Sequence, residues 1–243
     1  MSRKKHYFPD LEWLIISNQD YSFSFAAKGG HNLEAHNHND VGSFLIADKE
    51  EQYIVDLGAG EYTKEYFDLN TRYNYVNTRS ISHSVPIING CEQRSGNYSS
   101  NILKQIEINN VEEFMIDLTD LYPSQSKISS YIRTYKINCD LKQVIIKDSI
   151  SFKEEEEYQV IQTFPSYIKP QLIKENSQIN FEGREQNLTL DFEKKDCHYK
   201  MSTLYFNSHK GLKKKFYISQ LITNKSGRKY SQEFVLNLKK INN

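Results

Sequence analysis

Short runs of alternating apolar and polar residues recur along most of the chain. Residues Tyr21–Phe25 alternate aromatic side chains with serine, and Val111–Leu118 interleaves apolar residues with acidic ones. A period of two is the pattern of a strand with one buried face. The pattern predicts strands over residues 11–16, 21–25, 41–47, 51–57, 80–90, 102–108, 111–118, 131–137, 143–150, 158–163, 188–192, 201–206, 216–222 and 233–238.

Polar turn segments separate these runs. Asn109-Asn110 and residues 138–140 indicate tight turns, whereas residues 61–82 have weak periodicity and predict a long loop with a helical turn. No segment predicts a long helix. Many short strands at regular spacing are typical of an all-β fold, a large antiparallel β-sandwich whose core of Phe, Tyr, Ile and Val lies between two sheets. Because no linker rich in Pro, Gly or Ser divides the chain, residues 1–243 are predicted to form a single domain.

The composition narrows the classes of partner. The 243 residues include 31 basic and 31 acidic side chains, and the short tract Lys213–Lys215 is interpreted as the solvated start of a strand. Without clustered positive charge, neither a nucleic acid nor a membrane surface is an expected partner. The sequence predicts no membrane span and no signal peptide. Three widely spaced cysteines form no disulfide framework or metal-binding pair, so the cellular compartment stays undetermined.

The segment His36-Asn37-His38-Asn39-Asp40 carries the strongest chemical signal. In an extended segment alternate residues share a face, so His36, His38 and Asp40 are expected to project to the same side. Imidazole and carboxylate groups are ligands for zinc or iron, and imidazole also transfers protons near neutral pH. Because a strand is predicted to follow at once, the cluster is expected at the mouth of that strand.

Two further donors lie near the predicted ends of other strands. Asp56 ends the strand over residues 51–57, and His83 opens the strand within residues 80–90. Adjacent strands are about 5 Å apart, so side chains at neighbouring strand ends can converge. Two histidines and one aspartate form a suitable donor set for zinc, which takes three or four protein ligands.

These residues form part of a longer pattern that resembles the heparinase II/III-like polysaccharide lyases. Over most of residues 20–150 the chain follows the order and spacing of the family's motifs. The later strands match the family only in their pattern of apolar and polar residues. The matching elements are Gly29-Gly30-His31-Asn32, His36–Phe44, Val55–Tyr62, Arg72-Tyr73, His83–Pro86, Asn89-Gly90, Asp117–Thr119, Tyr122-Pro123, Arg133-Thr134 and Asp148.

The resemblance implies a fold and a set of site residues. In this family a large antiparallel β-sandwich forms the C-terminal part of the enzyme. His38, Asp56 and His83 correspond to the family's zinc ligands, and the zinc is expected to be mainly structural. His36 corresponds to the sandwich's contribution to the catalytic centre. Tyr73, or alternatively Tyr75, corresponds to a tyrosine that some members use near the substrate.

The resemblance also implies an activity and partners. These lyases cleave acidic polysaccharides next to a uronic acid by β-elimination, with His36 as base or as donor to the uronate carboxylate. Arg79 either binds that carboxylate or forms a structural ion pair. The family's N-terminal α/α toroid supplies other catalytic residues, and this chain contains no helical array. We therefore expect weak or no lyase activity from the sandwich alone, with a toroid domain as its separate or removed partner. The sequence does not identify the polysaccharide.

Other functions stay open at this point. A carbohydrate-binding or assembly domain would keep zinc for stability and stack sugars on exposed aromatic residues such as Tyr62, Tyr66, Phe67, Tyr73 and Tyr75. Gly30 followed by His36-x-His38 resembles the start of a cupin motif, although Gly42 and Ser43 stand where its Glu is expected. A related iron-dependent oxygenase would use His38, Asp40 and His83 as a facial triad. Asp40 is otherwise expected to accept a hydrogen bond from a ligand imidazole. His6, His198 and His209 are interpreted as isolated surface residues.

Overall fold

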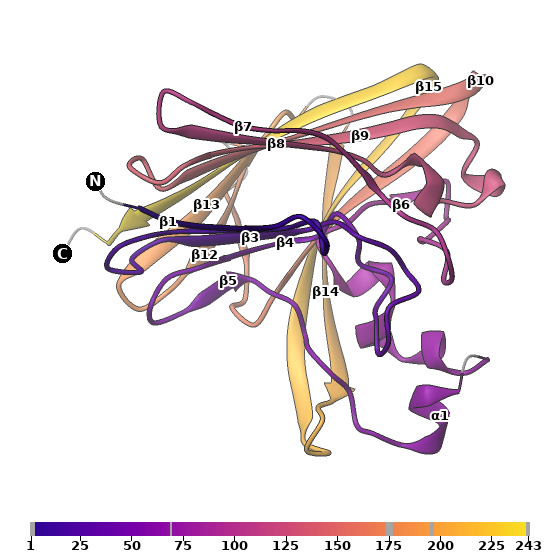
Figure 1. Ribbon diagram of the computed structural model, residues 1–243, viewed down its shortest axis with the longest axis horizontal. Helices are drawn as coiled ribbons and strands as arrows, with labels where there is room; N and C mark the ends of the chain where they lie inside the picture. Colours follow the sequence, from indigo (N-terminus) through magenta and orange to yellow (C-terminus); the bar gives the residue numbers. More distant parts are fainter. Residues whose placement is uncertain (1–2, 69, 174–176, 195–196, 242–243) are drawn as a thin grey trace.

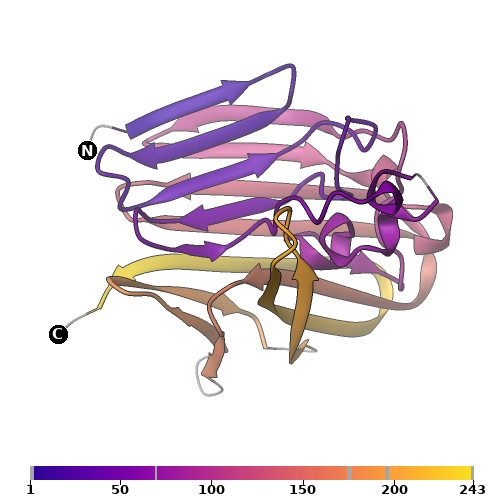
Figure 2. The ribbon, with the colours of Figure 1, turned by 90° about the horizontal axis from the view of Figure 1, so that it is seen from below.

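Two antiparallel sheets pack face to face in the computed structural model, which describes residues 3–68, 70–173, 177–194 and 197–241 (Figure 1). The smaller sheet has the strand order β1-β2-β3-β4-β5. Its strands are β1 (Arg3–Phe8), β2 (Trp13–Asn18), β3 (Ser24–Lys28), β4 (Phe44–Ala47) and β5 (Gln52–Ile54). Figure 2 looks onto this sheet, with strands of the larger sheet behind it.

The larger sheet has ten strands, eight of which follow the order β11-β12-β13-β15-β10-β9-β8-β7. β14 pairs with β15, and β6 pairs with β10. The strands are β6 (Ile87–Ile88), β7 (Asn101–Ile108), β8 (Val111–Asp117), β9 (Ile128–Asn138), β10 (Gln143–Ser166), β11 (Gln171–Ile173), β12 (Gln178–Glu182), β13 (Gln186–Phe192), β14 (Cys197–Asn207) and β15 (Lys213–Lys240).

The core lies between the two sheets, as the alternation predicts. Phe25 on β3 and Phe44 on β4 are buried, and their rings lie 5.8 and 6.2 Å from the ring of Tyr135 on β9. Burial of one such side chain stabilises the fold by about 1.5–3 kcal/mol. The predicted all-β sandwich with a core of Phe, Tyr, Ile and Val is confirmed.

A buried ion pair lies on two neighbouring strands of the larger sheet. Arg133 on β9 and Asp148 on β10 are joined by two hydrogen bonds of 2.7 Å. Nη1 of the guanidinium donates to the carbonyl oxygens of Gly42, at 2.8 Å, and Ser84, at 2.6 Å, and Nη2 also donates to Oε1 of Gln162 at 3.2 Å. The pair therefore anchors two loops that approach the candidate site from different parts of the chain.

Two strands are far longer than the sequence predicts. The expected strands 143–150 and 158–163 are both parts of β10, and 216–222 and 233–238 are both parts of β15. The acidic run between the first two lies at a β-bulge, where the pairing with β15 shifts between Ser151 and Glu156. A bulge accommodates exposed residues without ending the strand. The expectation of short strands throughout is therefore wrong for this part of the sheet. β1, β11 and β12 were not predicted.

One end of the larger sheet extends beyond the sandwich as a hairpin. β14 pairs with the first half of β15, and Figure 1 shows this hairpin leaving the body of the molecule. Phe206, Phe216 and Ile218 of the hairpin form a small apolar cluster with Val55 and Leu57. Because Asp56 lies between the last two residues, this cluster supports the backbone that carries it.

The segment after β5 is built from short helical turns. These are α1 (Lys64–Phe67), η1 (Arg72–Asn74), η2 (Val76–Thr78) and η3 (Ser80–Ser82), and η4 (Thr119–Leu121) and η5 (Ser124–Ser126) occur later. The predicted long loop with a helical turn is thus confirmed. The expected strand opened by His83 is wrong, because His83 ends η3 and β6 begins only at Ile87. Among the described residues, no helix has both the length and the apolar character needed to cross a bilayer.

Candidate metal centre and adjoining cavity

Four side chains of the types that bind metal ions converge where the loops meet. One ligand atom from each of His38, Asp40, Asp56 and His83 lies within 4.8 Å of the others. His38 and Asp40 precede β4, Asp56 follows β5, and His83 follows η3. The structure therefore brings together the three residues matched to the zinc ligands and adds Asp40. The donors come from loops, not from the ends of neighbouring strands as predicted.

The backbone turns sharply before His38. His36 has a φ of 62°, a left-handed conformation, so residues 36–40 are not extended. His38 and Asp40 join the metal-type cluster, whereas the ring of His36 lies 5.0 Å from Phe67 and 6.2 Å from Tyr62. The prediction that all three side chains share one face is wrong for His36. This turn separates the exposed imidazole from the buried one two residues later.

Hydrogen bonding fixes the tautomer of His83. Its Nε2 lies 3.1 Å from the backbone oxygen of Asn77. A carbonyl oxygen only accepts, so Nε2 carries the proton and donates it. The lone pair is then on Nδ1, which lies 3.6 Å from Oδ2 of Asp56. Metal-binding imidazoles are commonly oriented by such a contact on the other nitrogen.

His38 is held by a buried tyrosine. Its Nε2 lies 3.3 Å from the hydroxyl of Tyr66, which also accepts hydrogen bonds of 3.1 Å from the Gly60 N–H and from Nδ2 of Asn77. The ring centroids of His38 and His83 are 5.2 Å apart. Tyr66 and Asn77 therefore position both imidazoles side by side.

The electrostatics of the cluster favour the protonation states that metal ligands need. Burial, and next the neighbouring His83, lower the pKa of His38 to about 4. Burial alone would raise the pKa of Asp56, but the imidazoles of His83 and His38 and the Gly58 N–H lower it below its ordinary value. At neutral pH His38 is thus a neutral imidazole and Asp56 a carboxylate, as cation binding requires.

Asp40 is engaged by an ammonium group. Nζ of Lys28 lies 2.7 Å from Oδ1 of Asp40 and 3.7 Å from a carboxylate oxygen of Glu34. Burial would lower the pKa of Lys28, but the Asp40 and Glu34 carboxylates raise it above its ordinary value. Lys28 therefore stays charged and holds Asp40. The facial triad of an oxygenase, which would use Asp40, is disfavoured by this ion pair.

The remaining donor set fits zinc. Two ligand atoms about 2.1 Å from a tetrahedral ion are about 3.4 Å apart, close to the 3.6 Å between His83 and Asp56. His38, Asp56 and His83 supply two nitrogens and one oxygen, which is an ordinary zinc donor set. The ligand atom of His38 lies within 4.8 Å of those of Asp56 and His83.

A cavity of about 390 Å³ opens beside the cluster. One end lies over the outer face of the smaller sheet, and the other reaches the metal-type donors. Its lining residues are Trp13, Ile15, Ala26, Ala27, Lys28, Glu34, Ala35, His36, Asn37, His38, Asp40, Ser43, Leu45 and Asp56. His36 is thus exposed at the same cavity that reaches His38 and Asp56.

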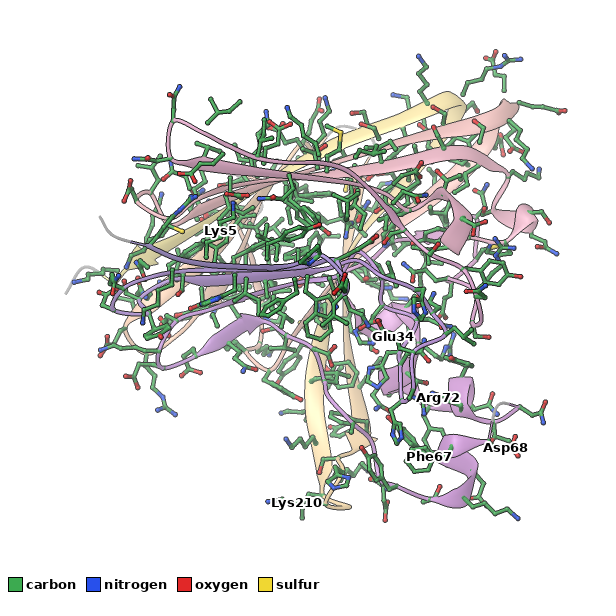
Figure 3. All side chains as sticks on the ribbon, viewed as in Figure 1. Lys5, Glu34, Phe67, Asp68, Arg72 and Lys210 are labelled. Carbon is green, nitrogen blue, oxygen red and sulfur yellow. The ribbon has the colours of Figure 1, made fainter. Side chains whose placement is uncertain are left out.

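Arg72 fixes the loop that carries His36 and His38. Its buried guanidinium donates to the backbone oxygen of Asn37 and, at 3.1 Å, to that of Tyr66. In Figure 3 the labelled Arg72 lies on the side of the molecule where α1 projects. In the sequence, Arg72 stands out only as a match to the family pattern. Nothing in the sequence indicates that it holds the loop of His36 and His38. Lys28 and Asn77 were missed for the same reason, because each acts through a contact distant in sequence. The expectation that Tyr66 is an exposed ring is wrong, because Tyr66 is buried.

The other predicted site residues lie around this loop. The Tyr73 hydroxyl donates to Oδ1 of Asn37 at 3.3 Å, and the Tyr75 hydroxyl lies 3.2 Å from Oγ1 of Thr63. Arg79 forms an ion pair with Glu92, which is the structural alternative that the sequence left open. Neither these two tyrosines nor Arg79 lines the cavity.

Comparisons with known proteins give a consistent result. A family model described as "Heparinase II/III-like, C-terminal" matches residues 1–235. A heparan sulfate lyase from Pedobacter heparinus superimposes with a TM-score of 0.78 at 12% identity, covering 98% of this chain and 37% of that one. A heparinase III gene product gives 0.77 at 11% identity, covering 98% and 36%. At these identities the likeness concerns the fold. No curated protein sequence matches the chain significantly.

A more distant structure shows how widely this architecture occurs. A 4-alpha-glucanotransferase from Thermococcus litoralis superimposes with a TM-score of 0.52 at 10% identity, covering 99% of this chain and 40% of that one. The chain thus spans well under half the length of each of these three structures.

Proposed function

The chain belongs to the heparinase II/III-like C-terminal family, and on that premise we propose that it is the zinc-containing β-sandwich module of a polysaccharide lyase. Its substrate would be a glycan that contains uronic acid, cleaved by β-elimination. The observation that carries the proposal is the position of His36. Its exposed imidazole lines the same cavity as His38 and Asp56, two members of the metal-type cluster.

The reaction requires four events at neighbouring atoms of the sugar. A base removes the proton next to the uronate carboxylate, the electrons of that C–H bond form a carbon–carbon double bond, and the bond to the leaving glycosidic oxygen breaks. The leaving oxygen then takes up a proton. Negative charge develops on the carboxylate during proton removal, so a nearby donor or cation lowers the barrier.

His36 is the residue of this chain suited to that chemistry. An imidazole acts as a base when neutral and as a hydrogen-bond donor when protonated, so it can serve either step. The Tyr73 hydroxyl is bonded to the Asn37 side chain, next to His36 in sequence, and would give or take the second proton. Lys28 also lines the cavity, and its ammonium is paired there with Asp40.

The cation would act mainly through structure. His38, Asp56 and His83 come from three loops, and when bound the ion would supply positive charge and join those loops. His38 is two residues from His36, so ordering His38 also orders the catalytic loop. Arg72 and Tyr66 already restrain this loop in the protein alone.

The rest of the cleft would come from a toroid domain. The chain covers 37% of the Pedobacter heparinus lyase, and the remaining part of such an enzyme would form the opposite wall. An acidic polysaccharide or oligosaccharide is the proposed ligand of the joined domains. For the chain alone we expect weak or no turnover.

The direct test measures the unsaturated product by its ultraviolet absorbance. Wild-type protein and His36→Ala are incubated with heparan sulfate, chondroitin sulfate and alginate, with and without a toroid domain supplied in trans. The expected result is product from at least one glycan with wild type and none with His36→Ala, at equal zinc content. Equal rates for the two proteins would contradict the role of His36, and no product under any condition would contradict the lyase proposal.

A non-catalytic carbohydrate-binding module is the second candidate. It is favoured by the exposed rings of Tyr62 and Phe67, which lie beside His36. Glycan binding without double-bond formation, in the presence of the toroid, would favour this candidate over the lyase.

A further inference from the structure

Four aromatic rings form a continuous cluster that begins at the cavity and ends at the tip of the β14–β15 hairpin. We call the rings of His36, Tyr62, Phe67 and His209 the aromatic platform. The ring centroids of His36 and Phe67 are 5.0 Å apart, those of Phe67 and Tyr62 are 4.8 Å apart, and those of Tyr62 and His209 are 4.2 Å apart. His209 is therefore not an isolated surface residue as the sequence suggested.

The platform is exposed but held in place. Tyr62 is 48% and Phe67 is 39% exposed, although both are large apolar side chains. Tyr62 also stacks on the buried ring of Tyr66, at 5.8 Å between centroids and an interplanar angle of 27°. Rings that are already fixed lose little conformational entropy when a ligand binds.

The backbone around the platform is tied to the hairpin. The N–H of Glu61 donates to the backbone oxygen of Asn207 at 3.1 Å, and Gly60 forms an isolated bridge with Ser208. The tip of the hairpin is thereby joined to the segment that carries Tyr62. Figure 3 shows Lys210 at this tip and Phe67 on α1 nearby.

The surroundings of the rings indicate what kind of ligand they bind. Exposed charged side chains flank them, among them Lys64, Glu65 and Asp68 next to Phe67 in sequence, and Lys210 next to His209. A narrow aromatic strip bordered by hydrogen-bonding groups does not resemble the broad apolar surface of a stable protein–protein interface. It suits a pyranose ring, which has an apolar C–H face and a rim of hydroxyl groups.

We infer that the aromatic platform is a sugar-stacking subsite that binds the pyranose neighbouring the one at His36. This inference rests on the proposed function, because it takes the ligand to be the same uronate-containing glycan. His36 belongs both to the cavity and to the platform, so a chain with one sugar at His36 would place its next sugars over Phe67 and Tyr62. Lys210 would then meet an acidic group farther along the chain.

The experiment compares binding of oligosaccharides of increasing length by isothermal titration calorimetry. The probes are disaccharides, tetrasaccharides and hexasaccharides prepared from heparan sulfate, chondroitin sulfate and alginate. Tyr62→Ala and Phe67→Ala are expected to weaken hexasaccharide binding by about five- to tenfold and to leave disaccharide binding unchanged. Tyr62→Phe, which keeps the ring, is expected to bind like wild type.

A matched control is available at the opposite end of the smaller sheet. Tyr21 is 48% exposed and lies in the turn between β2 and β3, at the end of the sheet away from the residues that line the cavity. Tyr21→Ala should therefore bind all oligosaccharides as wild type does. Thermal unfolding of each variant checks that the fold is retained.

The outcomes separate this inference from the lyase proposal. If both platform variants bind hexasaccharides with wild-type affinity, the aromatic platform is not a sugar subsite, whether or not the enzyme is active. The same holds if Tyr62→Ala changes only self-association in sedimentation, which would make the platform a protein-docking surface. Ring-dependent binding without any unsaturated product would uphold the subsite while the lyase proposal fails.

Discussion

Two buried polar clusters lie close to the same loops, and they differ in how completely the protein satisfies them. In the first, the Arg133 guanidinium is matched by the Asp148 carboxylate and by the Gly42 and Ser84 carbonyls. Tyr131 and Gln162 donate further hydrogen bonds to Asp148. Positive and negative groups balance, and the protein alone completes the cluster.

The second cluster lacks this balance. Asp56 and His83 present acceptor atoms toward one another, with 3.6 Å between Nδ1 of His83 and Oδ2 of Asp56, and the ring of His38 lies beside them. The Lys28 ammonium balances only Asp40. Buried polar groups are normally paired, so buried acceptors that face one another are suited to a cation. We therefore interpret the first cluster as structural and the second as a candidate ligand site.

The largest expected effect comes from breaking the complete cluster. Arg133→Met leaves the Asp148 carboxylate buried without its partner, which should lower the free energy of unfolding by about 3–5 kcal/mol. Urea denaturation measures the change. The double variant Arg133→Met with Asp148→Leu should recover most of the loss, because no buried charge remains. A single variant as stable as wild type would show that this pair does not hold the loops.

Acid is expected to lower the free energy of unfolding of the metal-free protein by a somewhat smaller amount. His38 in the folded state stays neutral down to about pH 4, whereas the unfolded chain takes up this proton near pH 6.5. Between these values the unfolded state binds more protons, so stability falls as the pH falls through this window, by up to about 3 kcal/mol.

The pH effect is measured as a difference between two variants. His38→Gln should remove this part of the pH dependence of unfolding between pH 7 and 4. His198→Gln, at an exposed position on β14, should retain it. If the free energy of unfolding depends on pH in the same way in the two variants, His38 is not buried in its neutral form.

Lys28 offers a smaller perturbation of the incomplete cluster. Lys28→Met leaves the buried Asp40 carboxylate unpaired and should cost the metal-free protein about 1–3 kcal/mol. Zinc should recover part of this loss, because Asp40 is then free to approach the cation. Lys104→Met removes an ion pair of similar length, 2.9 Å to Glu113, at a more exposed place and should cost less than about 1 kcal/mol. Equal costs for the two variants, with zinc making no difference, would contradict the account of Lys28.

Much of the fold follows from local pattern. Period-two alternation locates most of the strands, because one face of each lies on the core. Whether a strand continues through a polar stretch depends on its neighbours, and the pairing of β15 with β10 on both sides of the bulge carries β10 through residues 152–155. The strand β1 begins Arg-Lys-Lys-His, and no apolar alternation marks it.

The candidate site was predictable in its residue types but not in its geometry. His38, Asp56 and His83 were found through a motif with specific order and spacing. The turn at His36, and the contacts of Lys28, Tyr66 and Asn77, arise from segments brought together only by folding. Asp40 looked like a hydrogen-bond acceptor for histidine, and its partner is instead an ammonium group from β3.

We expect His38, Asp56 and His83 to bind a cation while His36 stays free for chemistry. Elemental analysis and zinc titration of purified wild type, His36→Ala, His38→Ala, Asp56→Ala and His83→Ala test it most directly, with circular dichroism as a check on folding. We expect one zinc per chain in wild type and in His36→Ala, and loss of zinc in His38→Ala, Asp56→Ala and His83→Ala. The free energy of unfolding of His36→Ala should differ from that of wild type by no more than about 0.5 kcal/mol. Zinc retained by folded His38→Ala, Asp56→Ala or His83→Ala, or lost from folded His36→Ala, would contradict it.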